Sequence, residues 1–257
     1  MLDLQKASIL KRISAYILDM ILVLILATGF AVVFSWAFGY AKHEAAMDSR
    51  RDYFIEEYGI TEFAKEFSLS EEEYDKLTKE QQDTYVAAYD AFAKDPEANY
   101  AYNMVVSLSF LIISLSVFIT YLGLEFTVPL FIGGGMTIGR KVFNVGIMHE
   151  NFVKLTPTTL FVRSILGKCT IETMVPIYLV LLIAFGQLGI VGLGVLLAML
   201  ILQLVLVFTT RTNSTIHDLL AHTVAVDYAS QMIFDSEEEL LRYKSERARE
   251  AAERQTY

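Results

Sequence analysis

Four long apolar stretches constrain the fold of this chain more than any other feature. They cover about residues 13–39, 102–124, 158–185 and 190–209, and a helix needs roughly 20 apolar residues to cross a bilayer. Hydrophobic residues make up 54% of the 257 positions and the mean hydropathy is +0.42, which is too apolar for an ordinary soluble domain. The sequence therefore predicts an all-α, polytopic membrane protein with four transmembrane helices.

The first stretch has a basic start, as a secretory signal peptide would, with Lys6, Lys11 and Arg12. Its apolar run from Met20 to Phe38 is too long for the core of a signal peptide, and no small-x-small cleavage site follows it. We therefore expect an uncleaved first span, with residues 1–40 forming the cytoplasmic N-terminus and this helix.

Basic residues cluster on one side of the predicted spans, and such residues are enriched in cytoplasmic loops. These residues are Lys6, Lys11, Arg12, Arg140, Lys141, Lys154, Arg163, Lys168 and Arg211. The other side holds residues 41–101 and a very short turn at 186–189. We therefore expect both termini in the cytoplasm and a multi-pass protein of the cell membrane, of the bacterial plasma-membrane type.

Residues 41–101 form an acidic insertion between the first two spans. They hold 16 acidic and 7 basic residues, which accounts for the whole net charge of −9 and leaves the rest of the chain balanced. The acidic balance argues against a nucleic-acid partner. Ser70 with Glu73 fits a capping box, and Asp95-Pro96 suggests a break before another helix. We expect an extracytoplasmic module of two or three amphipathic helices, either simply solvated or attracting cations.

Asp19 lies inside the first apolar stretch, where a carboxylate is unfavourable by about 2.5–3.5 kcal/mol at the helix centre. Such a residue is a functional-site hypothesis by default. Arg12, Ala15 and Asp19 share one helix face. Arg12 and Asp19 are separated by about 10 Å along a helix axis, so a direct pair would be strained.

The second span carries small polar residues, with Ser107 and Ser114 on one face and Ser109 and Ser116 on another. Such spacing indicates close helix packing or, alternatively, a polar pathway. Glu125 is expected to close this span at the cytoplasmic end.

Residues 131–156 form a glycine-rich cytoplasmic loop that does not span the membrane. The spacing of Gly134 and Gly139 resembles that of a phosphate-binding loop, but Arg140 replaces the lysine and no strand–helix context exists. We therefore discount nucleotide binding. Residues 142–148 and 152–155 are expected to form a short hairpin.

The remaining spans have clear boundaries. Thr156 is expected to cap the third span and Pro157 to begin it. Within this span, Lys168 and Glu172 can pair near the membrane surface, and Pro176 predicts a kink. After the fourth span we expect a short helix at 215–221 and an extended segment to 228. Residues 102–228 thus form one membrane region, and 229–257 a charged cytoplasmic helical tail.

Catalytic chemistry and cofactors are not expected. A single cysteine, Cys169, excludes an intrachain disulfide, and no Cys/His metal spacing exists. His217 and Asp218 are adjacent, so they do not face each other on a helix as a catalytic dyad would. The sequence predicts no enzyme, no metal and no cofactor.

Three segments in order resemble the RDD family of membrane proteins, which is named for one arginine and two aspartates. They are Arg12-x-x-Ala15-x-x-x-Asp19, Gly135-Met-Thr137-Ile-Gly139-Arg140, and His217-Asp218-Leu-Leu-Ala221-x-Thr223-Val-Ala-Val. The resemblance covers most of the chain outside residues 41–101 and the tail. His222 stands where the pattern has glycine, which puts a tight turn there in question, and the acidic insertion is longer than usual.

The resemblance implies that Arg12, Asp19 and Asp218 are the defining residues, and that the protein is either a transporter or an accessory protein that scaffolds a partner. Some family members look like antiporters of Na⁺, Li⁺ or K⁺ against protons. In that hypothesis Asp19 alternately binds a proton and a cation. The supporting residues are Ala15, Thr137, Gly139, Arg140, Arg163, His217, Thr223, Ser114 and Gln203.

The alternative is a structural lock, in which Arg12 pairs with Asp218 and Asp19 accepts hydrogen bonds from loop 134–140. The expected partners are the lipid bilayer and, for a transporter, monovalent cations, protons and a second copy of the chain, because four spans are few for alternating access.

Overall fold

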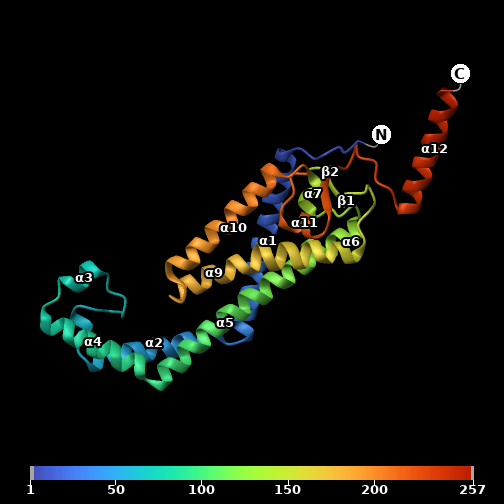
Figure 1. The fold of residues 1–257 in the computed structure, drawn as a ribbon. Helices are drawn as coiled ribbons and strands as arrows, with labels where there is room; N and C mark the ends of the chain where they lie inside the picture. The colour runs from blue at the N-terminus through green and yellow to red at the C-terminus, as the bar shows by residue number, and fades with distance from the viewer. Residues whose placement is uncertain (1–2, 256–257) are drawn as a thin grey trace. The chain divides into compact units, whose positions relative to one another are not determined.

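The structure is a computed structural model that describes residues 3–255. Within them, four helical stretches are long and apolar enough to cross a membrane (Figure 1). They are Ile9–Ala37, Pro96–Ile132, Pro157–Ala184 and Gly189–Thr209. Helices account for 73% of the structure. The predicted all-α architecture with four spans is confirmed, while the side that each terminus faces stays a prediction.

Two of the spans are interrupted by π-helical turns. The second consists of α5 (Pro96–Tyr121), η2 (Leu122–Thr127) and α6 (Val128–Ile132), and the third of α8 (Pro157–Phe161), η3 (Val162–Met174) and α9 (Val175–Ala184). Each π segment ends just before a proline, Pro129 or Pro176, which cannot donate a backbone hydrogen bond and crowds the preceding turn. The helix widens ahead of the proline.

The second span is longer than predicted. It runs to Ile132 instead of ending near residue 124. Glu125 does not close a helix end at the surface; it lies inside η2 and is 1% exposed. Its burial follows from the basic partners described below.

The chain divides into two compact units, each described by itself. Unit 1 contains the described residues up to Gly29 and those from Ser114 onward, and unit 2 contains Phe30–Ile113. Helix α1 (Ile9–Ala37) is the first span, and its residues up to Gly29 belong to unit 1. In the same unit, α9 packs against α10 (Gly189–Thr209) (Figure 1).

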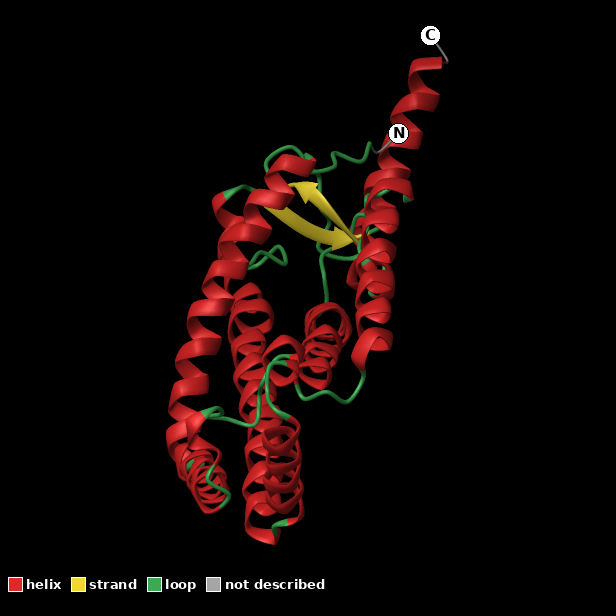
Figure 2. Ribbon diagram, turned by 90° about the vertical axis from the view of Figure 1, so that its left-hand side faces the viewer, coloured by secondary structure: helices red, strands yellow, loops and turns green. Residues whose placement is uncertain are grey.

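A two-stranded antiparallel sheet in unit 1 joins distant parts of the sequence (Figure 2). Strand β1 (Val145–His149) follows α7 (Ile138–Val142), and β2 (Thr223–Asp227) follows α11 (Ile216–Leu220). Val145 is opposite Asp227 and His149 opposite Thr223. The segment before α1 extends the sheet, because Ala7 donates a backbone hydrogen bond to Ala225.

The predicted hairpin of residues 142–148 with 152–155 is wrong. The chain does turn at 149–152, but β1 pairs with β2 instead. Both strands are buried along almost their whole length, and pairing them buries both apolar runs together. Val153 forms only an isolated bridge, to Phe234. A further helix of unit 1, α12 (Glu237–Gln255), carries the charged tail.

Unit 2 contains the acidic module, built from α2 (Tyr40–Glu57), the 3₁₀ turn η1 (Ile60–Glu62), α3 (Glu71–Asp75) and α4 (Lys79–Lys94). A small apolar core of Ile55, Ile60, Ala64 and Ala88 holds these helices together. The predicted helical character and the Ser70–Glu73 capping box are confirmed.

Candidate functional site

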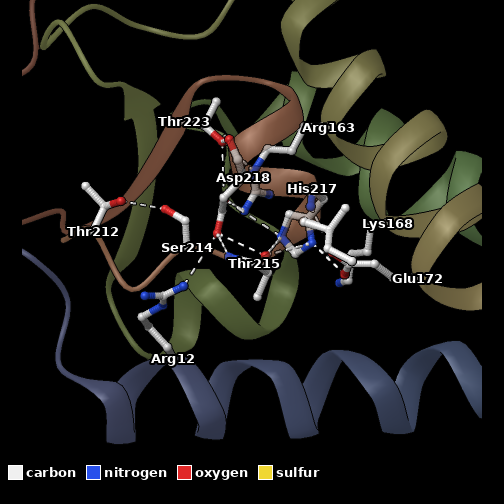
Figure 3. A network of polar contacts seen from close by, with 12 residues as sticks. Arg12, Arg163, Lys168, Glu172, Thr212, Ser214, Thr215, His217, Asp218 and Thr223 are labelled. Atoms are coloured by element: carbon white, nitrogen blue, oxygen red, sulfur yellow. Dashed lines mark hydrogen bonds and ion pairs between the residues drawn. The ribbon is translucent and has the colours of Figure 1, made fainter. Parts of the chain in front are cut away.

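Asp218 lies at the centre of a buried polar network in unit 1 (Figure 3). Arg163 of η3 donates to its Oδ1 from Nη2 at 2.6 Å and from Nε at 3.1 Å. Arg12, from the first helical turn of α1, reaches Oδ2 from Nη2 at 3.5 Å. The Asp218 side chain is only 2% exposed, so this carboxylate ties the first span, the third span and the last motif together.

Local sequence places Asp218 within reach of both arginines. Thr215 and Asp218 form the capping box that begins α11. Gly167 lets η3 approach α11 closely, because a Cβ there would lie 2.8 Å from the backbone Cα of His217. The Thr223 hydroxyl lies 3.2 Å from both the Arg163 Nε and the Asp218 Oδ1.

The electrostatics of Asp218 favour the ionised form. Burial alone raises the pKa of this carboxyl, but the positive charges of Arg163 and Arg12 outweigh burial and hold its pKa well below the usual range. The group is therefore a permanent anion in the folded protein, which suits a fixed structural partner better than an exchanging one.

His217, the neighbour of Asp218, has a separate acidic partner in the third span. Its backbone N–H donates to Glu172 Oε1 at 2.8 Å, and its Nδ1 lies 2.7 Å from Glu172 Oε2. Burial lowers the pKa of the imidazole below its usual value, although Asp218 raises it. Gln203 of α10 faces the same carboxylate and accepts from the Ile216 N–H at 3.5 Å.

Asp19 is buried against the start of α7 and has neutral donors. Thr137 Oγ1 donates to its Oδ2 at 2.5 Å, and the Gly139 N–H donates to its Oδ1 at 2.7 Å. The approach is so close that a Cβ on Gly139 would lie 2.4 Å from the Ala15 backbone oxygen. Small residues at 15 and 139 are therefore a steric requirement of this contact.

Glu125 is the third buried acid, and it has two basic partners. Lys168 of η3 forms an ion pair with its Oε1, and Arg140 of α7 lies 3.5 Å from its Oε2. The Lys168 ammonium also lies over the rings of Tyr16 and Tyr121, at 5.6 and 5.8 Å from their centroids. This layer joins α1, η2, η3 and α7.

The charges of these groups balance. The network contains the cations Arg12, Arg140, Arg163 and Lys168 and the carboxylates Asp19, Glu125, Glu172 and Asp218. With His217 neutral, their formal charges cancel. A balanced set of ions is the arrangement in which buried charge is least unfavourable.

The structure brings most of the predicted site residues together in two contacts. Arg12 meets Asp218 with Arg163 and Thr223, and Asp19 meets Thr137 and Gly139, as the structural-lock hypothesis expects. Arg12 and Asp19 are not paired with each other in the described ion pairs.

Two predicted supporting residues lie elsewhere. Ser114 shares a hydrogen bond of 2.8 Å with the hydroxyl of Tyr178, and Gln203 faces α11. The predicted Lys168–Glu172 pair is wrong as well, because each side chain has a partner on another element, Glu125 and His217 respectively.

Sequence reasoning did not assign site roles to Glu125, Lys168 and Glu172. An available signal was their position as ionisable residues within apolar helices. The doubt about His222 is also resolved: it adopts φ 50° and forms the turn between α11 and β2, a conformation more usual for glycine.

Comparison with known proteins adds one match. The RDD family matches the chain over residues 6–222, which is most of its length and includes the first two motifs and the His217–Ala221 start of the third. No curated protein and no solved structure matches it. With Arg12, Asp19 and Asp218 all placed in the buried network, the sequence match and the contacts agree, and the chain belongs to the RDD family.

Proposed function

We propose that the protein is a membrane transporter that exchanges a monovalent cation for protons, with Asp19 as the binding carboxylate. The observation that carries this proposal is the environment of Asp19. It is 5% exposed in a spanning helix, and its described hydrogen bonds come from a hydroxyl and an amide rather than from a basic side chain. A buried carboxylate without a basic side chain in contact is suited to binding a proton or a cation.

The surroundings of Asp19 have the chemistry for such an exchange. Hard cations prefer oxygen ligands, and the Thr137 hydroxyl contributes an oxygen beside the carboxylate. A proton or cation on Asp19 competes with the Gly139 N–H for the same oxygen atoms. Occupancy would therefore weaken the contact between α1 and α7, which couples binding to movement of the loop.

Arg12 and Asp218 would act as a gate in this mechanism and not as the carrier. Asp218 is a permanent anion with two arginine partners, whereas Arg12 has a single long contact of 3.5 Å to it. That contact is longer than either hydrogen bond from Arg163, so it is the Asp218 contact best suited to opening.

A second candidate function is favoured by the balanced charges. If the network is only a lock, the protein is a non-transporting accessory protein, and unit 2 or the tail binds a partner. Deleting residues 41–101 tests this role, because loss of a co-purifying partner with intact unit 1 would support it.

A flux assay separates the two functions. The protein is reconstituted in liposomes with a pH-sensitive dye, and Na⁺, Li⁺ or K⁺ is added outside. We expect cation-driven proton flux that Asp19→Asn abolishes and that Asp227→Asn, the same acid-to-amide change at the partner of Lys11, retains. Absence of flux from folded protein contradicts transport, and flux that survives in Asp19→Asn contradicts Asp19 as carrier.

We further propose cytoplasmic termini, a location in the cell membrane and a homo-oligomeric state. The distribution of basic residues supports the orientation. Exposed apolar side chains along α10, including Ile190, Val191 and Phe208, offer a surface for lipid or a second copy. Reporter fusions to each terminus and native mass spectrometry test these points.

A further inference from the structure

His217 is enclosed by charged groups from several elements. Glu172 and Arg163 of η3, Asp218 of α11 itself and Arg12 of α1 all belong to the network around it. Gln203 of α10 faces Glu172 as a neutral amide. The formal charges of these four groups cancel. Protonation of His217 would therefore give this cluster a net charge of +1.

The hydrogen bonds fix which ring nitrogen is free to accept a proton. An ionised carboxylate only accepts hydrogen bonds, so the 2.7 Å contact with Glu172 Oε2 requires the proton on His217 Nδ1. Nε2 then carries the lone pair. It lies 3.8 Å from Asp218 Oδ1, and the Thr215 hydroxyl is almost equally far from both ring nitrogens, at 3.0 Å from Nδ1 and 3.1 Å from Nε2.

We propose that Glu172 and His217 form a proton-binding site in which Nε2 of His217 takes up the proton and the imidazolium is held between the Glu172 and Asp218 carboxylates. The proton comes from water and returns to water, and no covalent bond in the protein changes. This site is separate from Asp19 and does not depend on whether the protein transports cations.

Proton uptake at His217 has a consequence for Arg12. A protonated imidazole 3.8 Å from Asp218 is a third cation competing for that carboxylate. Arg163 keeps two short bonds to it, whereas Arg12 has one contact of 3.5 Å. Acid therefore loosens the Arg12 contact first and releases the start of the first span.

Burial sets the pH range of this effect. Burial lowers the pKa of His217 below its usual value of about 6.5. The site is therefore empty at neutral pH and fills only as the pH falls below that value.

The first test measures protonation directly. A single-histidine protein (His43→Gln, His149→Gln, His222→Asn) is labelled with ¹⁵N-histidine and titrated in nanodiscs by NMR. We expect Nδ1 protonated throughout and Nε2 titrating below about pH 6.5, with Glu172→Gln lowering the midpoint by about one pH unit, since an adjacent charge shifts a pKa by about 1–3.

Three results overturn the proposal. The first is a neutral tautomer with the proton on Nε2, which is read from the single-histidine protein without any change at Glu172. The second is a midpoint that Glu172→Gln leaves unmoved, and the third is an imidazole that does not titrate between about pH 4 and 8.

The second test measures coupling to Arg12. Arg12→Gln should lower the melting temperature in nanodiscs more at about pH 7.5 than at a pH below the His217 midpoint found in the first test, because the contact is already loosened once His217 is protonated. Lys11→Gln, a change to the neighbouring lysine that pairs with Asp227, serves as the control. Equal losses for Arg12→Gln at both pH values contradict the link between His217 and Arg12.

Discussion

Asp218 is the shared anion of two basic side chains, Arg12 and Arg163. Replacing it with asparagine keeps the shape but leaves Arg12 and Arg163 without their anion. Removing one partner of a buried ion pair destabilises a protein by about 3–5 kcal/mol, and we expect Asp218→Asn to lower the free energy of unfolding by this amount, measured by denaturant titration in detergent.

The matched control is Asp227→Asn. Asp227 pairs with Lys11 at a more exposed position, where its side chain is 24% accessible, and such pairs contribute about 0–1 kcal/mol. The pKa of Asp218 is lowered, so its contribution persists at every pH above its ordinary unfolded value of about 3.9 and is lost only below it. Equal effects of the two substitutions would argue against the lock.

Single residues also show what sequence alone could reveal. Asp19 was identifiable because a charge within an apolar stretch is unusual, whereas Arg12 and Asp218 were identified through the resemblance to the RDD family. Their partners were not, since Arg12 and Asp218 lie 206 positions apart and spacing carries no information about such contacts. Lys168 illustrates the limit: helical spacing favoured Glu172, but the fold provides Glu125.

At the scale of elements, the contact between α1 and α7 depends on the absence of a side chain at Gly139. An added methyl group would lie 2.4 Å from a backbone oxygen of α1 that cannot move aside. We expect Gly139→Ala to lower stability by about 1–3 kcal/mol, the usual cost of overpacking. Thermal unfolding in detergent measures this loss.

Gly123→Ala is the control for that substitution. Gly123 lies in η2 and has no heavy atom within 4 Å of an added Cβ. A methyl group there should be neutral or slightly stabilising, because alanine favours helices. If Gly139→Ala were as harmless as Gly123→Ala, the close approach of α1 and α7 would be contradicted.

The positions of the helices were more predictable than their π-helical segments or the pairing of the strands. Length and hydropathy identified all four spans, and caps such as Thr156 fixed a boundary. The π segments depend on prolines acting together with tertiary packing, so only a kink at Pro176 was foreseeable. The sequence predicted a hairpin because segments that are close in sequence commonly pair. In the structure β1 pairs instead with β2, an apolar strand far away in the sequence, and the pairing buries both strands.

At the scale of the whole molecule, the two units should respond separately to damage. Ile60 is fully buried in the small core of unit 2. We expect Ile60→Asn to abolish slow hydrogen exchange across residues 40–94 and to leave residues 123–228 protected, since the two units have their own cores. Hydrogen exchange with mass spectrometry measures both regions in one experiment.

Val86→Asn is the control, because Val86 is 46% exposed on α4 of the same module. It should leave the exchange of both regions unchanged. Loss of protection in residues 123–228 after Ile60→Asn would show that unit 1 needs an intact module. The separation of an acidic module from the membrane region was readable from composition alone, but its core was not.

The sheet described above also dictates an order of biogenesis. The segment at Ala7 is fastened to Ala225, and Arg12 finds Asp218, only after the ribosome has made nearly the whole membrane region. Until then, Arg163 and Arg12 are charges without their carboxylate. A chain that stops before residue 218 therefore lacks the carboxylate that Arg12 and Arg163 share in the folded protein, and its first span has no ion pair to the last motif.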